Sequence, residues 1–232
     1  MCIVKLAQLK NAYRYNIDSL LLADFALKFG VENELLDIGA GNGIIGILLK
    51  KKLENLNLSL LDIQEENINL IKQNLKQNNI KAQIFHTDFL EFKSEKKFDF
   101  LVSNPPFYKE DILKSENSHK NISKFQDSLP LQEFISKANS IIKPKGVLYM
   151  CYKASFFDRI CSIFESKKFK LTKICFVYTN KSKKARLVLI EAKKSSKSLC
   201  EILPPFFVYE NENLSKEMQE IHSRFKLESY DI

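Results

Sequence analysis

The chain has 232 residues, a length that suits one domain or one domain with a small addition. Hydrophobic residues make up 45% and charged residues 28%, as in ordinary folded proteins, and no apolar run approaches the roughly 20 residues of a membrane-spanning helix. The first residues lack the zones of a signal peptide, so we expect a cytoplasmic protein without a membrane partner. The formal net charge of +8 suits a polyanionic partner such as RNA, although a general bias toward lysine would have the same effect.

Cysteine and histidine give no sign of a disulfide framework or a metal site. The five cysteines show no CxxC spacing, and the three histidines are dispersed. Both patterns differ from those of zinc sites and of disulfide scaffolds. We therefore expect core thiols, ordinary polar histidines and no bound metal.

Apolar periodicity alternates between strand-like and helix-like stretches, with no repeat and no long linker. In chain order, the predicted helices are residues 18–29, 44–52, 65–77, 131–142, 156–167 and 214–225, and the predicted strands are residues 34–38, 58–62, 82–86, 98–102, 147–152, 171–178 and 185–192. Asp18 is expected to cap the first helix. We divide one domain into a lead-in (residues 1–33), a core (34–193) and a C-terminal extension (194–232).

This order of elements indicates an α/β, Rossmann-like fold. Strands that alternate with helices form a mostly parallel sheet with helices on both faces, and here the sheet would have seven strands. Residues 179–184 between the last two strands are too few for a crossover helix. That pair is therefore expected to form an antiparallel hairpin at the edge of the sheet.

A glycine-rich turn follows the first predicted core strand. Its sequence is Asp37-Ile38-Gly39-Ala40-Gly41-Asn42-Gly43. Glycines let the backbone turn sharply and approach a ligand closely at the carboxyl ends of the strands. The acidic residue two positions before the first glycine suits a cationic amine better than a pyrophosphate. The turn therefore favours S-adenosylmethionine, with Asp37, Gly39, Gly41, Asn42 and Gly43 as binding residues.

Two further strand ends carry carboxylates that suit an adenosine. Asp62 ends the second predicted core strand, where it can accept both ribose hydroxyls, or simply cap the next helix. Asp88 follows the third, where it can accept a hydrogen bond from the adenine amine, or cap a turn. Ile63 or Phe89 is placed to sandwich the adenine ring.

The most specific signal follows the fourth predicted core strand and reads Asn104-Pro105-Pro106-Phe107. Two prolines fix the backbone and remove two N–H donors, which leaves the Asn104 side-chain oxygen and the Pro105 carbonyl as acceptors. An exocyclic amine or amide is a poor nucleophile because its lone pair is delocalised. Two acceptors that hold its N–H bonds localise the lone pair and aim it at the sulfonium methyl, and Phe107 can stack on the planar group. These residues indicate N-methylation, with Asn104 beside both acceptor and cofactor.

Together these motifs resemble those of the class I methyltransferases that modify amino or amide nitrogens. Three branches compete: enzymes for glutamine in release factors, for guanine in ribosomal RNA, and for adenine in tRNA or DNA. Flanking segments decide between them. Residues 15–22 are similar to a Gly-Thr-Asp-x-x-Leu-Leu segment, residues 184–190 to a last strand that carries an arginine (here Arg186), and residues 214–217 to a Tyr-Ser-x-Glu segment. All three belong to the tRNA1(Val) (adenine(37)-N6)-methyltransferase family.

The resemblance implies transfer of a methyl group to the adenine on the 3′ side of the anticodon, with tRNA as partner. Lysines of the 109–124 loop, with Lys181, Lys183, Lys184 and Arg186, would hold phosphates. Phe107 departs from the family's usual tyrosine, and guanine enzymes often have phenylalanine there. Guanine N2 of ribosomal RNA and a release-factor glutamine therefore stay open as acceptors. Outside the enzymes, the alternative is a module that binds RNA or acts as a scaffold and keeps S-adenosylmethionine for stability.

Overall fold

The computed structural model describes residues 3–8, 17–105 and 130–232. Its centre is a nine-stranded sheet, and all seven predicted strands belong to it. They are β2 (Glu34–Ile38), β3 (Asn57–Asp62), β4 (Gln83–His86), β5 (Phe98–Ser103), β6 (Ile142–Lys153), β7 (Phe169–Tyr178) and β8 (Ala185–Lys194). The remaining two, β9 (Glu201–Ile202) and β10 (Phe206–Phe207), are short and both pair with β7. The predicted α/β fold is confirmed.

The strand order is β7-β8-β6-β5-β2-β3-β4, and β8 alone of these seven runs antiparallel to its neighbours. From β2 the chain passes to β3 on one side, while β5 pairs with β2 on the other. This is the switch point where doubly wound sheets bind ligands, outside the carboxyl ends of the strands. The antiparallel β7–β8 hairpin is confirmed, with β8 inserted between β6 and β7.

The strand that the sequence predicts from residue 147 begins earlier in the structure. The helix predicted over residues 131–142 ends at Ile141, and β6 begins directly after it at Ile142, so that β6 includes the segment Lys143-Pro144-Lys145-Gly146. Lys145 has φ 62°, and the register between β5 and β6 shifts between Phe98 and Phe100. Residues 143–146 therefore form a bulge at the start of β6 instead of a separate turn.

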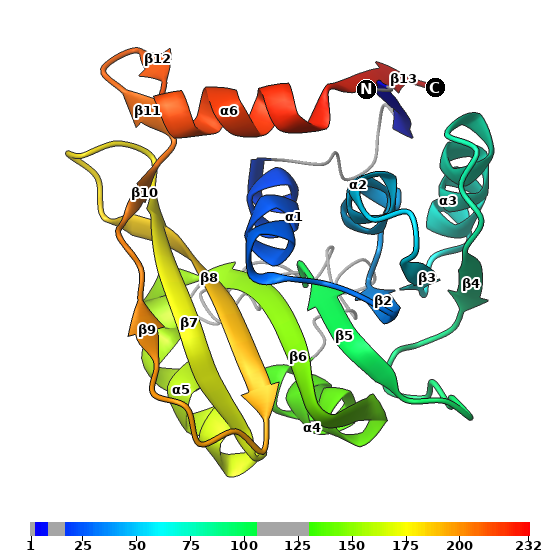
Figure 1. The fold of residues 1–232 in the computed structure, drawn as a ribbon, viewed down its shortest axis with the longest axis horizontal. Coiled ribbons are helices and arrows are strands. Elements are labelled where there is room, and N and C mark those ends of the chain that lie inside the picture. Colours follow the sequence, from blue (N-terminus) through cyan, green and yellow to red (C-terminus); the bar gives the residue numbers. More distant parts are fainter. Residues whose placement is uncertain (1–2, 9–16, 106–129) are drawn as a thin grey trace, which may run out of the picture.

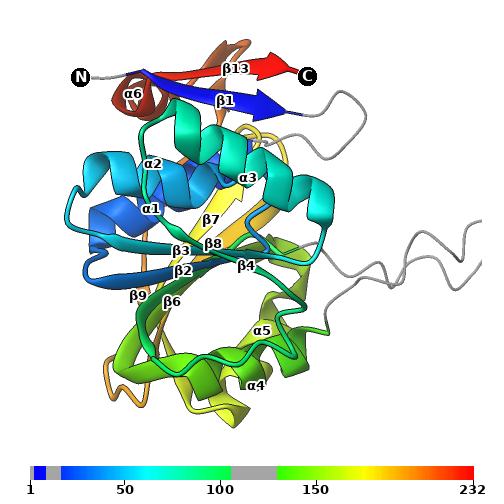
Figure 2. The same cartoon turned by 90° about the vertical axis from the view of Figure 1, so that its right-hand side faces the viewer.

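Helices cover both faces of the sheet (Figures 1 and 2). On one face lie α1 (Ile17–Phe29), α2 (Ile44–Lys52) and α3 (Glu65–Gln77), and on the other α4 (Leu131–Ile141) and α5 (Phe157–Ser166), which follows a 3₁₀ turn at Ala154–Phe156. Each face has its own cluster of buried apolar side chains. None of the described helices is long and apolar enough to cross a membrane.

The two ends of the chain form a small ribbon that the sequence did not predict. β1 (Val4–Gln8) pairs in parallel with β13 (Leu227–Asp231), which follows α6 (Lys216–Phe225), and the ribbon lies over α3 (Figure 2). Asn74 of α3 binds both backbone groups of Ala7, at 2.8 and 3.2 Å. Its amide also donates to the backbone oxygen of Asn42, at 2.9 Å. The ribbon is thus connected through one buried side chain to the glycine-rich turn.

The C-terminal part reaches α6 through a short hairpin of β11 (Tyr209–Glu210) and β12 (Asn213–Leu214). Ser215 caps α6, because its side chain accepts from the backbone N–H of Met218 at 3.1 Å. Three buried side chains of α6 (Met218, Ile221 and Phe225) belong to the same apolar cluster as α1 and α2. The helix is therefore packed on the core through its apolar side.

Candidate functional site

The glycine turn, residues 39–43, joins β2 to α2. Gly39, Gly41 and Gly43 have φ of 66°, 59° and 83°, in the left-handed region where a side chain would cost about 1–2 kcal/mol. No atom lies within 4 Å of the point where a Cβ would stand at Gly39 or Gly41. The turn therefore needs its glycines for backbone conformation, and it leaves open space beside its first two.

Asp37 lies beneath this turn, fully buried at the end of β2. Its Oδ2 accepts from the backbone N–H of Gly46 at 2.8 Å, which fixes the first turn of α2. Its Oδ1 is buried and has no hydrogen-bond partner among the described residues. Burial raises the pKa of Asp37 to about 7, the Gly46 bond lowers it in part, and the nearby charge of Asp62 adds to the rise. A cation brought to Oδ1 would favour the ionised form.

Gly46 is a site residue that the sequence interpretation missed. A Cβ at this position would lie 2.8 Å from Cδ1 of Leu58 and 3.2 Å from Oδ2 of Asp37. Only glycine therefore lets α2 approach β3 while its N–H reaches the carboxylate. The regular spacing of glycines ends at Gly43, but a glycine at the third position of an apolar helix is itself a signal of close packing.

Asp62 ends β3 and holds the glycine turn from the other side. Its Oδ2 accepts from the backbone N–H of Gly41 at 2.8 Å, and its Oδ1 accepts from the backbone N–H of Gln64 and the amide of Asn67, at 2.9 and 3.0 Å. Asp62 thus braces the start of α3, as the capping interpretation expected, and its role as a ribose acceptor stays a prediction. A carboxylate has about four lone-pair sites, so one remains for a ribose hydroxyl.

The side chain after Asp62 faces solvent, whereas the other candidate for stacking does not. Ile63 is 50% exposed, and Phe89 is 4% exposed and packs on Phe134 with ring centroids 5.1 Å apart. This burial argues against the expected contact of Phe89 with an adenine ring and leaves Ile63. Asp88 caps a turn by accepting from the backbone N–H of Leu90 at 2.8 Å, with Oδ1.

Asn42 presents a second unsatisfied buried atom. Its Oδ1 accepts from the backbone N–H of Ile44 at 3.3 Å, at the start of α2, whereas its Nδ2 has no hydrogen-bond partner among the described residues. Buried polar groups are nearly always paired, so such atoms call for a ligand or water. With Asp37 Oδ1, one orphaned acceptor and one orphaned donor border the glycine turn. This donor set fits the amine and carboxylate of the methionine part of S-adenosylmethionine.

Asn104 follows β5 at the same edge of the sheet, and its amide is held from two elements. Its Nδ2 donates to Oγ of Ser19 on α1 at 3.3 Å, and its Oδ1 accepts from Sγ of Cys151 on β6 at 2.9 Å. Pro105 is buried. Pro106 and Phe107 lie outside the described residues. Neither Ser19 nor Cys151 was among the expected site residues, because contiguous motifs carry no trace of such distant contacts.

An ion pair lies next to this amide. Asp18 is buried, and its Oδ1 accepts from Nη2 of Arg186 on β8 at 2.5 Å. The expected cap at Asp18 was wrong, because α1 already begins at Ile17 and the carboxylate turns to the guanidinium. Two segments that the sequence related to one family, 168 positions apart, thus meet in the structure. Arg186 is 45% exposed at its side chain and is engaged in the pair.

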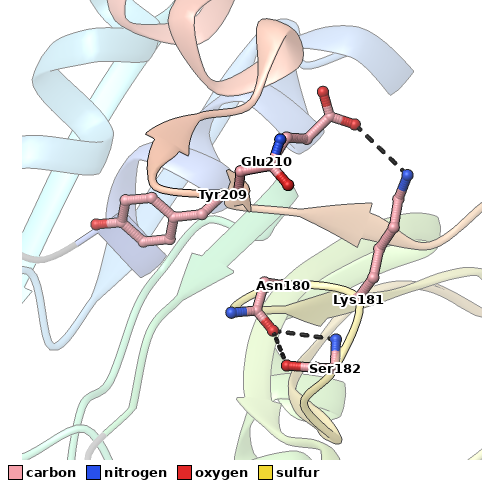
Figure 3. A pocket seen from close by; sticks show the side chains of 6 residues that line it. Asn180, Lys181, Ser182, Tyr209 and Glu210 are labelled. Carbon is pink, nitrogen blue, oxygen red and sulfur yellow. Dashed lines mark hydrogen bonds and ion pairs between the residues drawn. The ribbon is translucent and has the colours of Figure 1, made fainter.

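A shallow hollow of about 400 Å³ lies farther along the sheet edge (Figure 3). It is lined by the tip of the β7–β8 hairpin (Asn180, Lys181 and Ser182) and by Tyr209, Glu210 and Asn211. Asn180 Oδ1 accepts from the backbone N–H and the hydroxyl of Ser182, which closes the tip, and Lys181 lies 3.9 Å from Glu210. An exposed pair of this kind is worth little energy. The hollow is separate from the glycine turn and from Asn104.

In the described part of the chain, no group of histidine, cysteine and acidic side chains is arranged to hold a metal ion. The four described cysteines (Cys151, Cys161, Cys175 and Cys200) are all free thiols. Burial raises the pKa of the Cys151 thiol well above its usual range, and the charge of Asp18 adds to the effect. The Cys151 thiol therefore serves as neither a base nor a nucleophile at neutral pH.

The doubly wound sheet, the glycine turn at its switch point and the two unsatisfied buried atoms define a class I S-adenosylmethionine-dependent methyltransferase. The chain belongs to the methyltransferase small domain family, which matches residues 15–159.

Curated relatives agree with this class. The tRNA1(Val) (adenine(37)-N6)-methyltransferase of Flavobacterium johnsoniae is 29% identical over 172 residues, 71% of this chain and 73% of the relative. The enzyme of the same name from Flavobacterium psychrophilum is 28% identical over 193 residues, 80% of this chain and 82% of the relative. A bifunctional methyltransferase of Rickettsia typhi is 31% identical over 140 residues, 56% of this chain and 27% of the relative.

Solved structures share the fold. A predicted O-methyltransferase from Agrobacterium tumefaciens superposes with a TM-score of 0.70 over 93% of this chain and 100% of that one, at 16% identity. A ribosomal protein L11 methylase from Lactobacillus delbrueckii gives a TM-score of 0.57 over 78% and 81%, at 17% identity. At such identities the likeness concerns the fold alone.

Proposed function

We propose that this enzyme transfers a methyl group to the exocyclic N6 of an adenine in the tRNA anticodon loop, adenine 37 of tRNA1(Val). The observation that carries the proposal is Asn104, placed after β5 at the edge that also holds the glycine turn. The names of the curated relatives support the choice of acceptor. An anticodon-loop base can be splayed out and stacked without melting a duplex, which suits a site on an open sheet edge. In this proposal the enzyme works in the cytoplasm.

In the proposed cofactor site, Asp37 and Asn42 take the amine and carboxylate of the methionine part. Asp62 takes one ribose hydroxyl with its remaining lone-pair site, instead of the two expected from the sequence. Ile63 contacts the adenine, and Asp88 accepts from its amine with the oxygen that Leu90 leaves unused. Gly39, Gly41 and Gly43 let the backbone come close. Bound S-adenosylmethionine supplies a methyl group on a sulfonium, a good leaving group.

On the acceptor side, the Asn104 oxygen and the Pro105 carbonyl accept the two N–H bonds of the amine. Its lone pair is then localised and directed at the methyl carbon. With S-adenosylmethionine bound, the C–N bond would form as the C–S bond of the donor breaks, and the amine would then lose one proton to solvent. Positioning supplies most of the rate, because no strong base is required before the methyl group moves. Pro106 keeps the backbone rigid and Phe107 stacks on the base in this proposal.

The charged tip of the β7–β8 hairpin supports an RNA substrate. Lys181, Lys183 and Lys184 are exposed there, at the carboxyl end of β7 and hence on the same edge as Asn104. Strands lie about 4.8 Å apart, so β8 runs roughly 10 Å from β5. Lysines at the tip of this hairpin can hold the phosphates that flank a splayed base.

The test is an assay of the purified enzyme with labelled methyl donor against three acceptors: bulk tRNA, ribosomal subunits and release factor. We expect label in tRNA, recovered as N6-methyladenosine. Label in 2-methylguanosine of ribosomal RNA or in glutamine would mean that the acceptor is guanine or glutamine instead of adenine. Binding of donor and tRNA with no transfer to any of the three would favour the non-catalytic module.

A further inference from the structure

The amide of Asn104 is held in one orientation by a thiol and a hydroxyl. Cys151, near the carboxyl end of β6, is fully buried, and its Sγ lies 2.9 Å from Oδ1 of Asn104. Oγ of Ser19, in the first turn of α1, accepts a hydrogen bond from Nδ2 of Asn104 at 3.3 Å. The proposed reaction depends on this orientation, because only the oxygen of the amide can accept an N–H bond of the acceptor.

The thiol is the partner that distinguishes the two ends of the amide. Hydroxyl groups in general donate as readily as they accept, which makes them less selective partners for one end of an amide. A protonated thiol is a better donor than acceptor, and burial keeps the Cys151 thiol protonated by raising its pKa. A reversed amide would set its NH₂ group against the S–H donor. Cys151 therefore selects the orientation in which Oδ1 faces the thiol.

We propose that Cys151 is a positioning residue for methyl transfer, which fixes the amide of Asn104 through an S–H···O hydrogen bond. A carbonyl-type oxygen has two lone pairs. One accepts from Cys151, and the other stays available for an N–H of the acceptor amine. The inference rests on the proposed role of Asn104 in catalysis and adds the element that orients it.

The surroundings of the thiol make its position well defined. Cys151 faces Leu189 in the antiparallel pairing of β6 with β8, two pairs from the β8 end that leads to Arg186. The Asp18–Arg186 ion pair joins that end of β8 to the first turn of α1, where Ser19 follows Asp18. Two elements, α1 and β6, thus supply the partners of the Asn104 amide, and β8 is tied to α1 beside Ser19. A shift of α1 or β6 would move a hydrogen-bond partner of Asn104.

The experiment compares Cys151→Ala, which removes the donor, with Cys151→Ser, which keeps one. Cys175→Ala is the matched control, because Cys175 is also a buried thiol of the same sheet, on β7, and its Sγ contacts the Pro204 carbonyl instead of a site residue. A single neutral hydrogen bond corresponds to roughly a tenfold change in rate. We expect Cys151→Ala to lower kcat on tRNA about tenfold, with the Kd for S-adenosylmethionine and the KM for tRNA unchanged.

Cys151→Ser should recover kcat to within about twofold of the wild type, and Cys175→Ala should leave it unchanged. Full activity of Cys151→Ala, or equal losses in Cys151→Ala and Cys151→Ser, would overturn the inference. Asn104→Ala, measured beside them, separates the two proposals. If Asn104→Ala is inactive while Cys151→Ala is fully active, only the role of Cys151 fails. If Asn104→Ala itself retains kcat, the proposed catalysis fails first.

Discussion

The cofactor half of the site (Asp37, the glycine turn and Asp62) comes from the ends of two adjacent strands, whereas the acceptor half (Asn104, Ser19, Cys151 and the Asp18–Arg186 pair) combines elements from nearly the whole chain. The cofactor half keeps two buried polar atoms without partners. The Asn104 amide, in contrast, has both of its polar atoms paired. In the proposed site, the first half would receive a charged ligand, and the second would hold one acceptor group in a fixed direction.

Loss of Asn104 should have the largest effect and separate the two halves most clearly. Asn104→Ala removes an acceptor that acts on the reacting amine, so kcat should fall roughly 10²–10³-fold, as for other preorganised polar groups. The Kd for S-adenosylmethionine, measured by calorimetry on the same preparation, should stay within about twofold of the wild type. A parallel loss of cofactor affinity would mean that the halves are not separate.

Loss of Asp62 should give the opposite pattern. Asp62→Ala removes the acceptor of the Gly41 N–H and the brace at the start of α3. Hydrogen bonds to a charged group contribute about 1.5–3 kcal/mol each, so the Kd for the cofactor should rise by about a hundredfold. Glu66→Ala, an exposed acidic residue of the same helix, is the control and should leave the Kd unchanged. Unchanged affinity in Asp62→Ala would remove Asp62 from the proposed cofactor site.

Breaking the Asp18–Arg186 ion pair should lower the stability of the fold around the acceptor half. Arg186→Ala leaves the buried Asp18 carboxylate without its guanidinium, and because that guanidinium is partly exposed we expect a loss of about 1–3 kcal/mol in the free energy of unfolding. The loss of kcat should exceed any change in cofactor affinity, since Ser19 adjoins Asp18. Thermal denaturation checks the first effect, with Lys184→Ala as the exposed neighbour that should cost nothing. Equal stability of the two variants would contradict a structural role of the pair.

The smallest expected effect is the pH dependence of cofactor binding. With a pKa of about 7, Asp37 is mostly protonated at pH 6, and a cationic amine prefers the carboxylate form. The ionised fraction of Asp37, and with it the affinity, should therefore rise about eightfold from pH 6 to 7.5. This window ends below the usual pKa of an α-amine. Because the pKa is raised on folding, the unbound enzyme should lose stability as pH increases from about 4 to 7. Asp37→Asn should flatten both profiles, and an unaltered slope would assign the titration to another group.

The fold could be predicted, and the cofactor half proposed, because their signals are local. Strand and helix periodicities predicted all seven core strands, and the proposed binding groups of the glycine turn lie within seven consecutive residues. The local sequence did not decide the contacts of a residue that had two possible neighbours. Phe89 belongs to the apolar cluster with Phe134, a contact across 45 positions that only the packing of α4 determines.

The acceptor half illustrates what a single sequence leaves open. Asn104 was predictable from its prolines, but Cys151 lies in a strand of buried residues where nothing distinguishes it from a core thiol. Asp18 looked like a helix cap because the carboxylate precedes an apolar helix, and its real partner lies on β8. The β1–β13 ribbon was missed because both strands are short and are defined only by pairing between the two ends of the chain.

The most direct test of the account is nucleoside mass spectrometry of tRNA1(Val) from a strain that lacks this gene. The account predicts that N6-methyladenosine disappears from the anticodon loop, returns when the wild-type protein is supplied, and stays absent with Asn104→Ala. Unchanged N6-methyladenosine in the deletion strain would contradict the proposed activity.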